Sequence, residues 1–331
     1  MLSPGPWHPK IQRYSLEGFS KFPRVSRPRT TRLPAVDNAE THRSTPVRTA
    51  VVTGGNRGIG YAVAARLLQD GCEVVLVARD RERGEAARAS LAGSGGTRVR
   101  LVVGDLSSVR KVRATARALG ETCPRIDVLV HNAGLWPSRR VLGEDGLEQA
   151  FVTNHLAPFL LNHELEPLLV ASGARVVQVS AGLYVNGRAD PERTPTGLDF
   201  HPMRTYADTK LCNLLLVPRS AERWKNAGVT INAVHPGVIR TGLGDRGGPL
   251  GYLLKAAKLL WKSPDAGARP VVRLALAEET AGQTGRYFHI DAEQPLAPVA
   301  ADAALAERLW TQALELTGLK PTPPPVRHDV T

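Results

Sequence analysis

The chain has 331 residues, of which 42% are hydrophobic and 22% are charged, a composition that excludes global disorder. Its three cysteines, Cys72, Cys123 and Cys212, are too few and too scattered for a disulfide framework or a cysteine metal site, and they indicate a reducing, cytoplasmic compartment. No apolar run reaches the roughly 20 residues that span a bilayer, so no membrane span is expected.

The formal net charge of +12 is concentrated at one end of the chain. The first 48 residues hold nine lysines and arginines against three acidic residues, which is half of the excess. Nucleic-acid binding is therefore not expected, because the remaining basic residues are interspersed with acidic ones. A pocket for cofactor phosphates accounts for part of the remainder.

Residues 1–46 carry seven prolines and show no helical or strand period, which predicts a disordered, basic, proline-rich extension. Three interpretations stay open: an inert extension, a stretch that precedes the true start of translation, or a transit peptide. Residues 319–331 form a second proline-rich tail. Residues 47–318 between them are predicted to fold as one domain.

That domain alternates strands and helices. Strands are expected at residues 49–53, 73–78, 98–103, 126–130, 174–179, 229–234 and 286–290. Helices are expected at residues 58–70, 80–92, 107–119, 145–171, 205–226, 250–262, 265–279 and 301–317. The alternation predicts an α/β fold, a single Rossmann-type doubly wound parallel sheet of about seven strands with helices on both faces. Pro218 should kink or break its helix, and the two longest helices could pair subunits in a homo-oligomer.

The first strand runs into a glycine-rich turn and then a helix. Glycines at such a turn let the backbone approach a pyrophosphate, and the helix N-terminus presents free N–H groups to it. The residues expected to bind the cofactor here are Gly54, Asn56, Arg57, Gly58, Ile59 and Gly60.

The end of the second strand indicates the preferred nucleotide. An NAD site places a carboxylate at this point for the ribose hydroxyl, whereas this chain has Ala78 followed by Arg79. Arg57 and Arg79 together supply two cations for a 2′-phosphate. NADP(H) is therefore predicted over NAD(H).

Two further strand ends carry candidate cofactor contacts. Asp105 and Leu106 follow the third strand, and Asn132, Ala133 and Gly134 follow the fourth. Asp105 can accept from an adenine amino group, and the small residues let the chain pass beneath the cofactor. Open α/β sheets bind ligands at this carboxyl edge.

Tyr206 and Lys210 lie four residues apart on a predicted helix, one turn from each other. The lysine cation should lower the tyrosine pKa and make the phenol a general acid–base. A hydroxyl proton could then move through Tyr206 while hydride moves to or from a nicotinamide.

In order, the motifs TGGNRGIG, DL at 105–106, HNAG at 131–134, Asn154, the Tyr206/Lys210 pair and HPGVIRT at 235–241 resemble the short-chain dehydrogenase/reductase family. The resemblance covers residues 48 to about 290. The long interval before Tyr206 and the long region after the last motif are similar to the retinol dehydrogenase-like and protochlorophyllide reductase-like branch. Members of that branch often take bulky lipophilic substrates.

The resemblance implies specific roles. Tyr206 would donate or accept the proton, and Lys210 would bind the nicotinamide ribose and depress the tyrosine pKa. Asn154 would hold a water that relays protons from Lys210. The nicotinamide side of the cofactor would contact the segment that contains Pro236, Gly237, Val238 and Thr241.

One position departs from the family pattern. The catalytic serine is the second residue of a Ser-Ser pair, and here that position holds Ala181, with Ser180 before it. Adjacent strand side chains point to opposite faces, so Ser180 can serve only if the strand end twists or the alignment shifts by one. Tyr184 or Asn186 could supply a substitute donor.

Together these features predict an NADP(H)-dependent oxidoreductase that interconverts an alcohol and a carbonyl on a small-molecule substrate of lipophilic or aromatic character. The alternative is an NADP(H)-binding sensor or scaffold with little or no turnover, which Ala181 favours. The catalytic residues are expected to be Tyr206, Lys210, Asn154 and Ser180, and no metal is expected.

Overall fold

Eight strands form one sheet in the order β3-β2-β1-β4-β5-β6-β7-β8 in the computed structural model, which describes residues 47–239 and 263–327. The strands β1 to β7 pair in parallel, and β8 runs antiparallel to β7. Their bounds are β1 Thr49–Thr53, β2 Glu73–Ala78, β3 Val99–Val103, β4 Val128–His131, β5 Arg175–Val179, β6 Thr230–His235, β7 Tyr287–His289 and β8 Ala292–Gln294. The predicted seven-stranded parallel sheet is confirmed, and β8 extends it.

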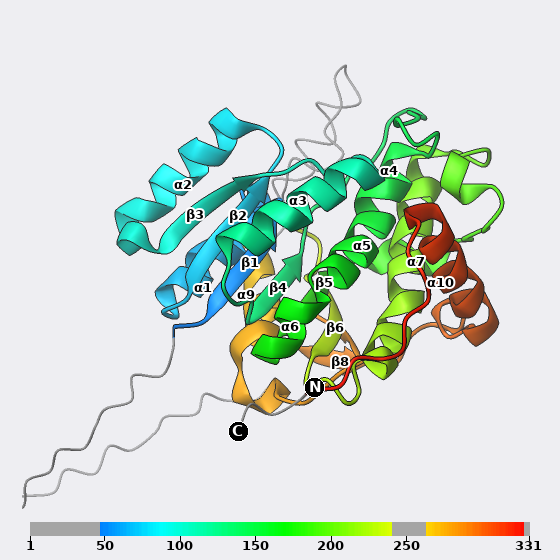
Figure 1. Cartoon of the computed structure of the whole chain (residues 1–331). Coiled ribbons are helices and arrows are strands. Elements are labelled where there is room, and N and C mark those ends of the chain that lie inside the picture. Colours follow the sequence, from blue (N-terminus) through cyan, green and yellow to red (C-terminus); the bar gives the residue numbers. More distant parts are fainter. Residues whose placement is uncertain (1–46, 240–262, 328–331) are drawn as a thin grey trace, which may run out of the picture. The chain divides into compact units, whose positions relative to one another are not determined.

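Helices cover both faces of this sheet (Figure 1). Alternate residues of β1 show why: Val51 belongs to one apolar core cluster, and Ala50 and Val52 belong to the other. The helix bounds are α1 Gly58–Gln69, α2 Arg81–Gly95, α3 Val109–Thr122, α4 Gln149–Phe151, α5 Ala157–Glu164, α6 Glu166–Ser172, α7 Pro202–Arg223, α9 Pro264–Leu276 and α10 Ala303–Thr317. The helices α1, α2 and α9 cover one face, α3, α5, α6 and α7 cover the other, and α10 packs on α7.

The strand order reverses between β1 and β4, which are hydrogen-bonded neighbours although two strands separate them in sequence. In open α/β sheets, ligands bind beyond the carboxyl ends of the strands at such a switch point. The glycine turn follows β1, and the segment His131–Gly134 follows β4. The fold therefore places these two predicted motifs on either side of the expected crevice.

Two predicted helices differ from the structure. The region 145–171 contains α4, one π-helical turn at Val152–Leu156, and then α5 and α6. No break occurs at Pro218, because α7 continues through it to Arg223. The turn that carries Tyr206 and Lys210 is intact.

Several predictions lie outside the described residues: the extension at 1–46, the helix at 250–262, Thr241 and the last four residues of the tail. Residues 319–327 form no helix or strand, yet Arg223 on α7 donates hydrogen bonds to the carbonyl oxygen and hydroxyl of Thr322 at 2.9 and 2.8 Å. This part of the tail therefore lies against the domain.

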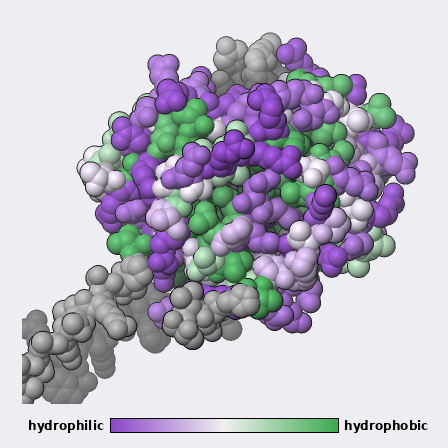
Figure 2. All heavy atoms as spheres, in the orientation of Figure 1, coloured by the Kyte–Doolittle hydropathy of each residue, from purple (hydrophilic) through white to green (hydrophobic). Residues whose placement is uncertain are grey.

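On the face drawn in Figure 2, hydrophobic residues form separate patches among hydrophilic ones. Scattered apolar residues of this kind are normal on a protein surface. Among the helices that the structure describes, none is both long enough and apolar enough to cross a bilayer.

Candidate active site

The turn after β1 leaves room for a phosphate group because its glycines lack the side chains that would otherwise occupy that space. Gly54 and Gly58 have φ angles of +64° and +57°, a conformation that favours glycine. A Cβ on Gly60 would overlap the carbonyl oxygen of Gly54 and the amide of Asn132. That amide donates to the carbonyl oxygens of Thr53 and Gly54 at 2.9 and 3.2 Å, which fixes the turn against β4.

The N-terminus of α1 is available to an anion. The residue before the helix is Arg57, whose side chain makes no capping hydrogen bond, and the first turn contains no acidic residue. The backbone N–H groups and the positive end of the helix dipole therefore remain for a ligand phosphate. Asn56 and Ile59 are partly accessible in this turn.

Two cations stand near the predicted 2′-phosphate position. Arg57 and Arg79 are exposed, and neither forms an ion pair or side-chain hydrogen bond with any residue in the described ranges. Ala78, at the end of β2, is buried and offers no carboxylate. Arg57 and Arg79 are the cations that a 2′-phosphate would meet here, and the preference for NADP(H) stays a prediction.

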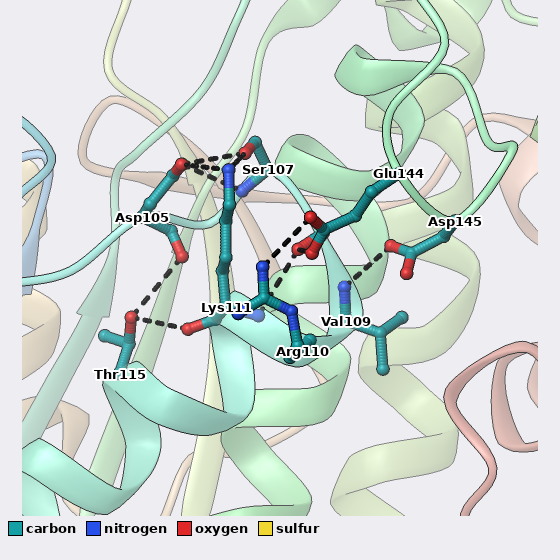
Figure 3. A network of polar contacts seen from close by, with 9 residues as sticks. Asp105, Ser107, Val109, Arg110, Lys111, Thr115, Glu144 and Asp145 are labelled. Carbon is teal, nitrogen blue, oxygen red and sulfur yellow. Dashed lines mark hydrogen bonds and ion pairs between the residues drawn. The ribbon is translucent and has the colours of Figure 1, made fainter.

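Asp105 belongs to a dense polar network at the start of α3 (Figure 3). One carboxylate oxygen accepts from the Ser107 backbone at 3.1 Å, and the other accepts from the Ser107 hydroxyl and the Lys111 ammonium, both at 2.9 Å. Burial alone would raise the pKa of Asp105, but these hydrogen bonds outweigh it and lower the pKa. The carboxylate is ionised and anchors the loop, while its predicted contact with adenine stays a prediction. Leu106 beside it is buried.

The N-terminus of α3 differs from that of α1 because protein groups already occupy it. Asp145 accepts from the Val109 backbone at 2.8 Å, and Glu144 accepts from the Ser108 hydroxyl at 2.5 Å (Figure 3). Glu144 also pairs with Arg110. Side chains of the protein thus satisfy part of the first turn of α3, whereas α1 has no side-chain cap.

The segment after β4 joins the cofactor side to the catalytic side. The backbone N–H groups of Asn132 and Ala133 donate to the Thr53 hydroxyl at 3.0 and 3.1 Å. A Cβ on Gly134 would lie 3.4 Å from the Asn154 side-chain oxygen and 3.8 Å from the Lys210 ammonium. The predicted strand-end motif and two predicted catalytic residues therefore converge at Gly134.

Asn154 is fully buried in the π-helical turn. Its side chain accepts from the Leu135 backbone at 2.6 Å and donates to the Leu135 carbonyl and the Thr209 hydroxyl at 2.8 and 3.0 Å. Its own carbonyl oxygen accepts from Asn213 at 2.7 Å. Single π-turns often mark functional sites, and here the turn is held by side chains from α7. The predicted water relay through Asn154 stays a prediction.

Tyr206 and Lys210 lie together on α7 and are each 5% exposed. The ammonium donates to the Val179 carbonyl at the end of β5 at 2.9 Å, and it lies 5.7 Å from the centre of the Tyr206 ring. Burial lowers the pKa of Lys210 to about 8, and burial raises the pKa of Tyr206. The predicted lowering of the tyrosine pKa is therefore wrong in direction, because loss of hydration disfavours the phenolate in this pocket.

The two residues at the serine position have different environments. Ser180 is 4% exposed, and its hydroxyl has no hydrogen-bond partner among the described residues. Ala181 is partly accessible and precedes a 3₁₀ turn at Gly182–Asn186. The accessible position thus carries a methyl group, and a catalytic role for Ser180 stays a prediction.

Tyr184 and Asn186, the two suggested substitute donors, differ in their exposure to solvent. Tyr184 is buried, and its hydroxyl accepts from the Ala297 backbone at 3.0 Å, which commits it to a structural contact. Asn186 is exposed. Asp208 on α7 accepts from the Arg188 backbone at 2.6 Å and so fixes the loop that contains both residues.

Pro236, Gly237 and Val238 follow β6 at the same edge of the sheet, and Gly237 has a φ of +93°. The neighbouring His235 stacks on His289 of β7 with ring centres 5.0 Å apart. Thr241 lies outside the described residues. Sequence reasoning did not identify Thr209 and Asn213, although they lie three and seven residues after Tyr206, a spacing that places side chains on one face of a helix.

Comparisons with known proteins agree with this geometry. A family model described as short chain dehydrogenase matches residues 48–247. Retinol dehydrogenase 14 of Mus musculus is 37% identical over 290 residues, covering 82% of this chain and 86% of that protein. Dehydrogenase/reductase SDR family member 13 of Homo sapiens is 40% identical over 281 residues, covering 83% and 74%. The structure of a Pseudomonas aeruginosa RhlG/NADP active-site complex is similar with a TM-score of 0.60 and 27% identity, covering 74% of this chain and 94% of that one. The chain belongs to the short-chain dehydrogenase family and is an oxidoreductase that acts on alcohol or carbonyl groups.

Proposed function

We propose that this protein is an NADP(H)-dependent oxidoreductase for lipophilic or aromatic carbonyls and alcohols. The observation that supports this most strongly is the convergence at Gly134, where a Cβ atom would lie 3.4 Å from the Asn154 side-chain oxygen and 3.8 Å from the Lys210 ammonium. When bound, NADP(H) supplies or accepts the hydride. This chain's own residues position the substrate oxygen and move its proton through Tyr206.

Apolar side chains around the carboxyl edge support a lipophilic substrate. Exposed large apolar residues include Val185 beyond β5, Met203 one turn before Tyr206, and Val238 beyond β6. Met203 shares α7 with Tyr206, and the other two lie beyond the carboxyl ends of β5 and β6. Similarity to a retinol dehydrogenase points to the same substrate class.

A purified-protein assay tests this function. We expect NADPH oxidation with apolar aldehydes and ketones, and a much weaker response to small polar ones. Binding of NADPH without turnover of any carbonyl or alcohol in the panel would favour the sensor or scaffold alternative, for which Ala181 is the specific observation. If the protein bound neither NADPH nor NADH, both the oxidoreductase and the sensor or scaffold hypotheses would be contradicted.

Arg57 and Arg79 are expected to set the preference for NADPH. Charged hydrogen bonds are each worth about 1.5–3 kcal/mol, so replacing both with alanine should weaken NADPH binding by at least about tenfold. NADH binding should change little. Titration calorimetry with both nucleotides measures this, and Arg308→Ala on α10 serves as the matched control. An equal loss of affinity for NADPH and NADH would show that these arginines do not bind the 2′-phosphate.

The pH dependence follows from the burial of the catalytic pair. Because burial raises the pKa of Tyr206, the phenol stays protonated at neutral pH and can donate its proton. The rate of carbonyl reduction should therefore be constant up to about pH 8 and fall above that pH, where Lys210 loses its charge. Alcohol oxidation needs the phenolate, so its rate should rise with pH through the same range.

Profiles of kcat in both directions test these slopes. Lys210→Arg keeps a cation whose pKa exceeds about 12, so its reduction profile should lose the fall above pH 8 even if its rate is lower. Reduction that accelerates steadily into alkaline solution would contradict the assignment.

A further inference from the structure

The indole of Trp136 lies flat against the ring of Tyr206, with ring centres 4.9 Å apart and planes inclined by 9°. Trp136 directly follows Leu135, whose backbone N–H and carbonyl are both held by Asn154, at 2.6 and 2.8 Å. The side chain beside the proposed acid is therefore positioned by the same buried asparagine that shapes the site.

The indole N–H of Trp136 is a buried donor with no acceptor among the described residues. Buried tryptophan N–H groups usually have a partner, because an unsatisfied donor is costly. An oxygen atom of a bound ligand would satisfy it. The carbonyl oxygen that receives the Tyr206 proton must come within hydrogen-bond distance of the Tyr206 hydroxyl, which belongs to the ring that the indole stacks against.

Ala181 leaves this site without the hydroxyl that the family carries there. Ser180 is also buried and unpaired, but it forms no hydrogen bond to Tyr206, whereas Trp136 contacts the ring directly. Trp136 is therefore better placed to act with the phenol.

We propose that the indole N–H of Trp136 donates a hydrogen bond to the substrate carbonyl oxygen, as the second donor beside the Tyr206 hydroxyl. This inference rests on the proposed function. The hydride for the carbonyl carbon would come from bound NADPH and the proton for its oxygen from Tyr206, which would yield an alcohol and NADP⁺ and leave a phenolate that takes a proton back from solvent. Trp136 keeps its own proton and stabilises the negative charge that develops on the oxygen.

Trp136→Phe removes the donor and keeps an aromatic ring against Tyr206. Loss of one such donor lowers kcat by about 10²–10³, so we expect a fall of about 10² with little change in KM. Adding Ala181→Ser to Trp136→Phe should restore most of kcat, which a purely structural role for the indole would not allow. Trp310→Phe, on α10, is the matched control for loss of a tryptophan.

A second readout does not depend on turnover. In protein with ¹⁵N-labelled tryptophan, the Trp136 indole N–H signal, assigned by its loss in Trp136→Phe, should move downfield when a ketone binds with NADP⁺. An unmoved signal, unchanged kcat in Trp136→Phe, failed rescue by Ala181→Ser, or a larger kcat loss in Ser180→Ala would each overturn the inference. If the wild type shows no turnover at all, the proposed function itself fails, which is a distinct result.

Discussion

Tyr206→Phe is expected to lower kcat by about 10²–10⁴ while leaving the fold and NADPH affinity in place. Phenylalanine keeps the ring that stacks on Trp136 at 4.9 Å and loses only the hydroxyl. Without the phenol, the carbonyl oxygen has no buried acid to protonate it as the hydride arrives. Steady-state kinetics and an NADPH titration on the same sample measure the two effects separately.

The control for this variant is a tyrosine that is buried but outside the reaction site. Tyr287→Phe on β7 removes a hydroxyl from a ring that packs edge-on against Tyr184, and it should leave kcat within a small factor of wild type. If Tyr206→Phe retained more than about a tenth of kcat, another group would be supplying the proton.

Gly60→Ala is expected to have the second largest effect, through cofactor binding. A Cβ at this position overlaps the backbone carbonyl oxygen of Gly54 and the side-chain amide of Asn132, and these two groups are hydrogen-bonded to each other in the turn that is proposed to hold the pyrophosphate. Overpacking of this kind costs about 1–3 kcal/mol, so NADPH binding should weaken by at least about tenfold and Tm should fall.

Gly93→Ala in α2 is the matched control, because an added Cβ there meets no atom within 4 Å. That variant should bind NADPH as the wild type does and be slightly more stable, since alanine favours helix. Equal NADPH affinity in Gly60→Ala and wild type would show that the glycine turn does not hold the pyrophosphate.

The order of strands and helices could be predicted because their apolar periods differ, but β8 could not. Its three residues, Ala292–Gln294, are all exposed and carry no alternation of apolar and polar side chains. The pairing with β7 alone defines it. The interruption of the predicted helix at 145–171 could not be predicted from the sequence either. It involves hydrogen bonds that Asn154 and Asn213 donate to residues distant in sequence.

Site residues were predictable where a motif fixes their backbone position, as at Gly60 and Gly134. The pKa values of the site residues could not be predicted in the same way. The spacing of Tyr206 and Lys210 shows that they share a helix face, but the burial that raises the tyrosine pKa involves residues far away in sequence, such as Trp136. The same holds for Asp105, whose partner Lys111 is evident only once α3 is placed.

Deuterium transfer tests the central claim most directly. NADPH carrying deuterium at the reactive nicotinamide carbon is incubated with an apolar ketone and the full-length protein, and the product is examined by mass spectrometry. We predict an alcohol with one deuterium at the carbinol carbon for the wild type, and almost none for Tyr206→Phe in the same time. NADPH consumption without labelled alcohol, or equal labelling by both proteins, would contradict hydride transfer assisted by Tyr206.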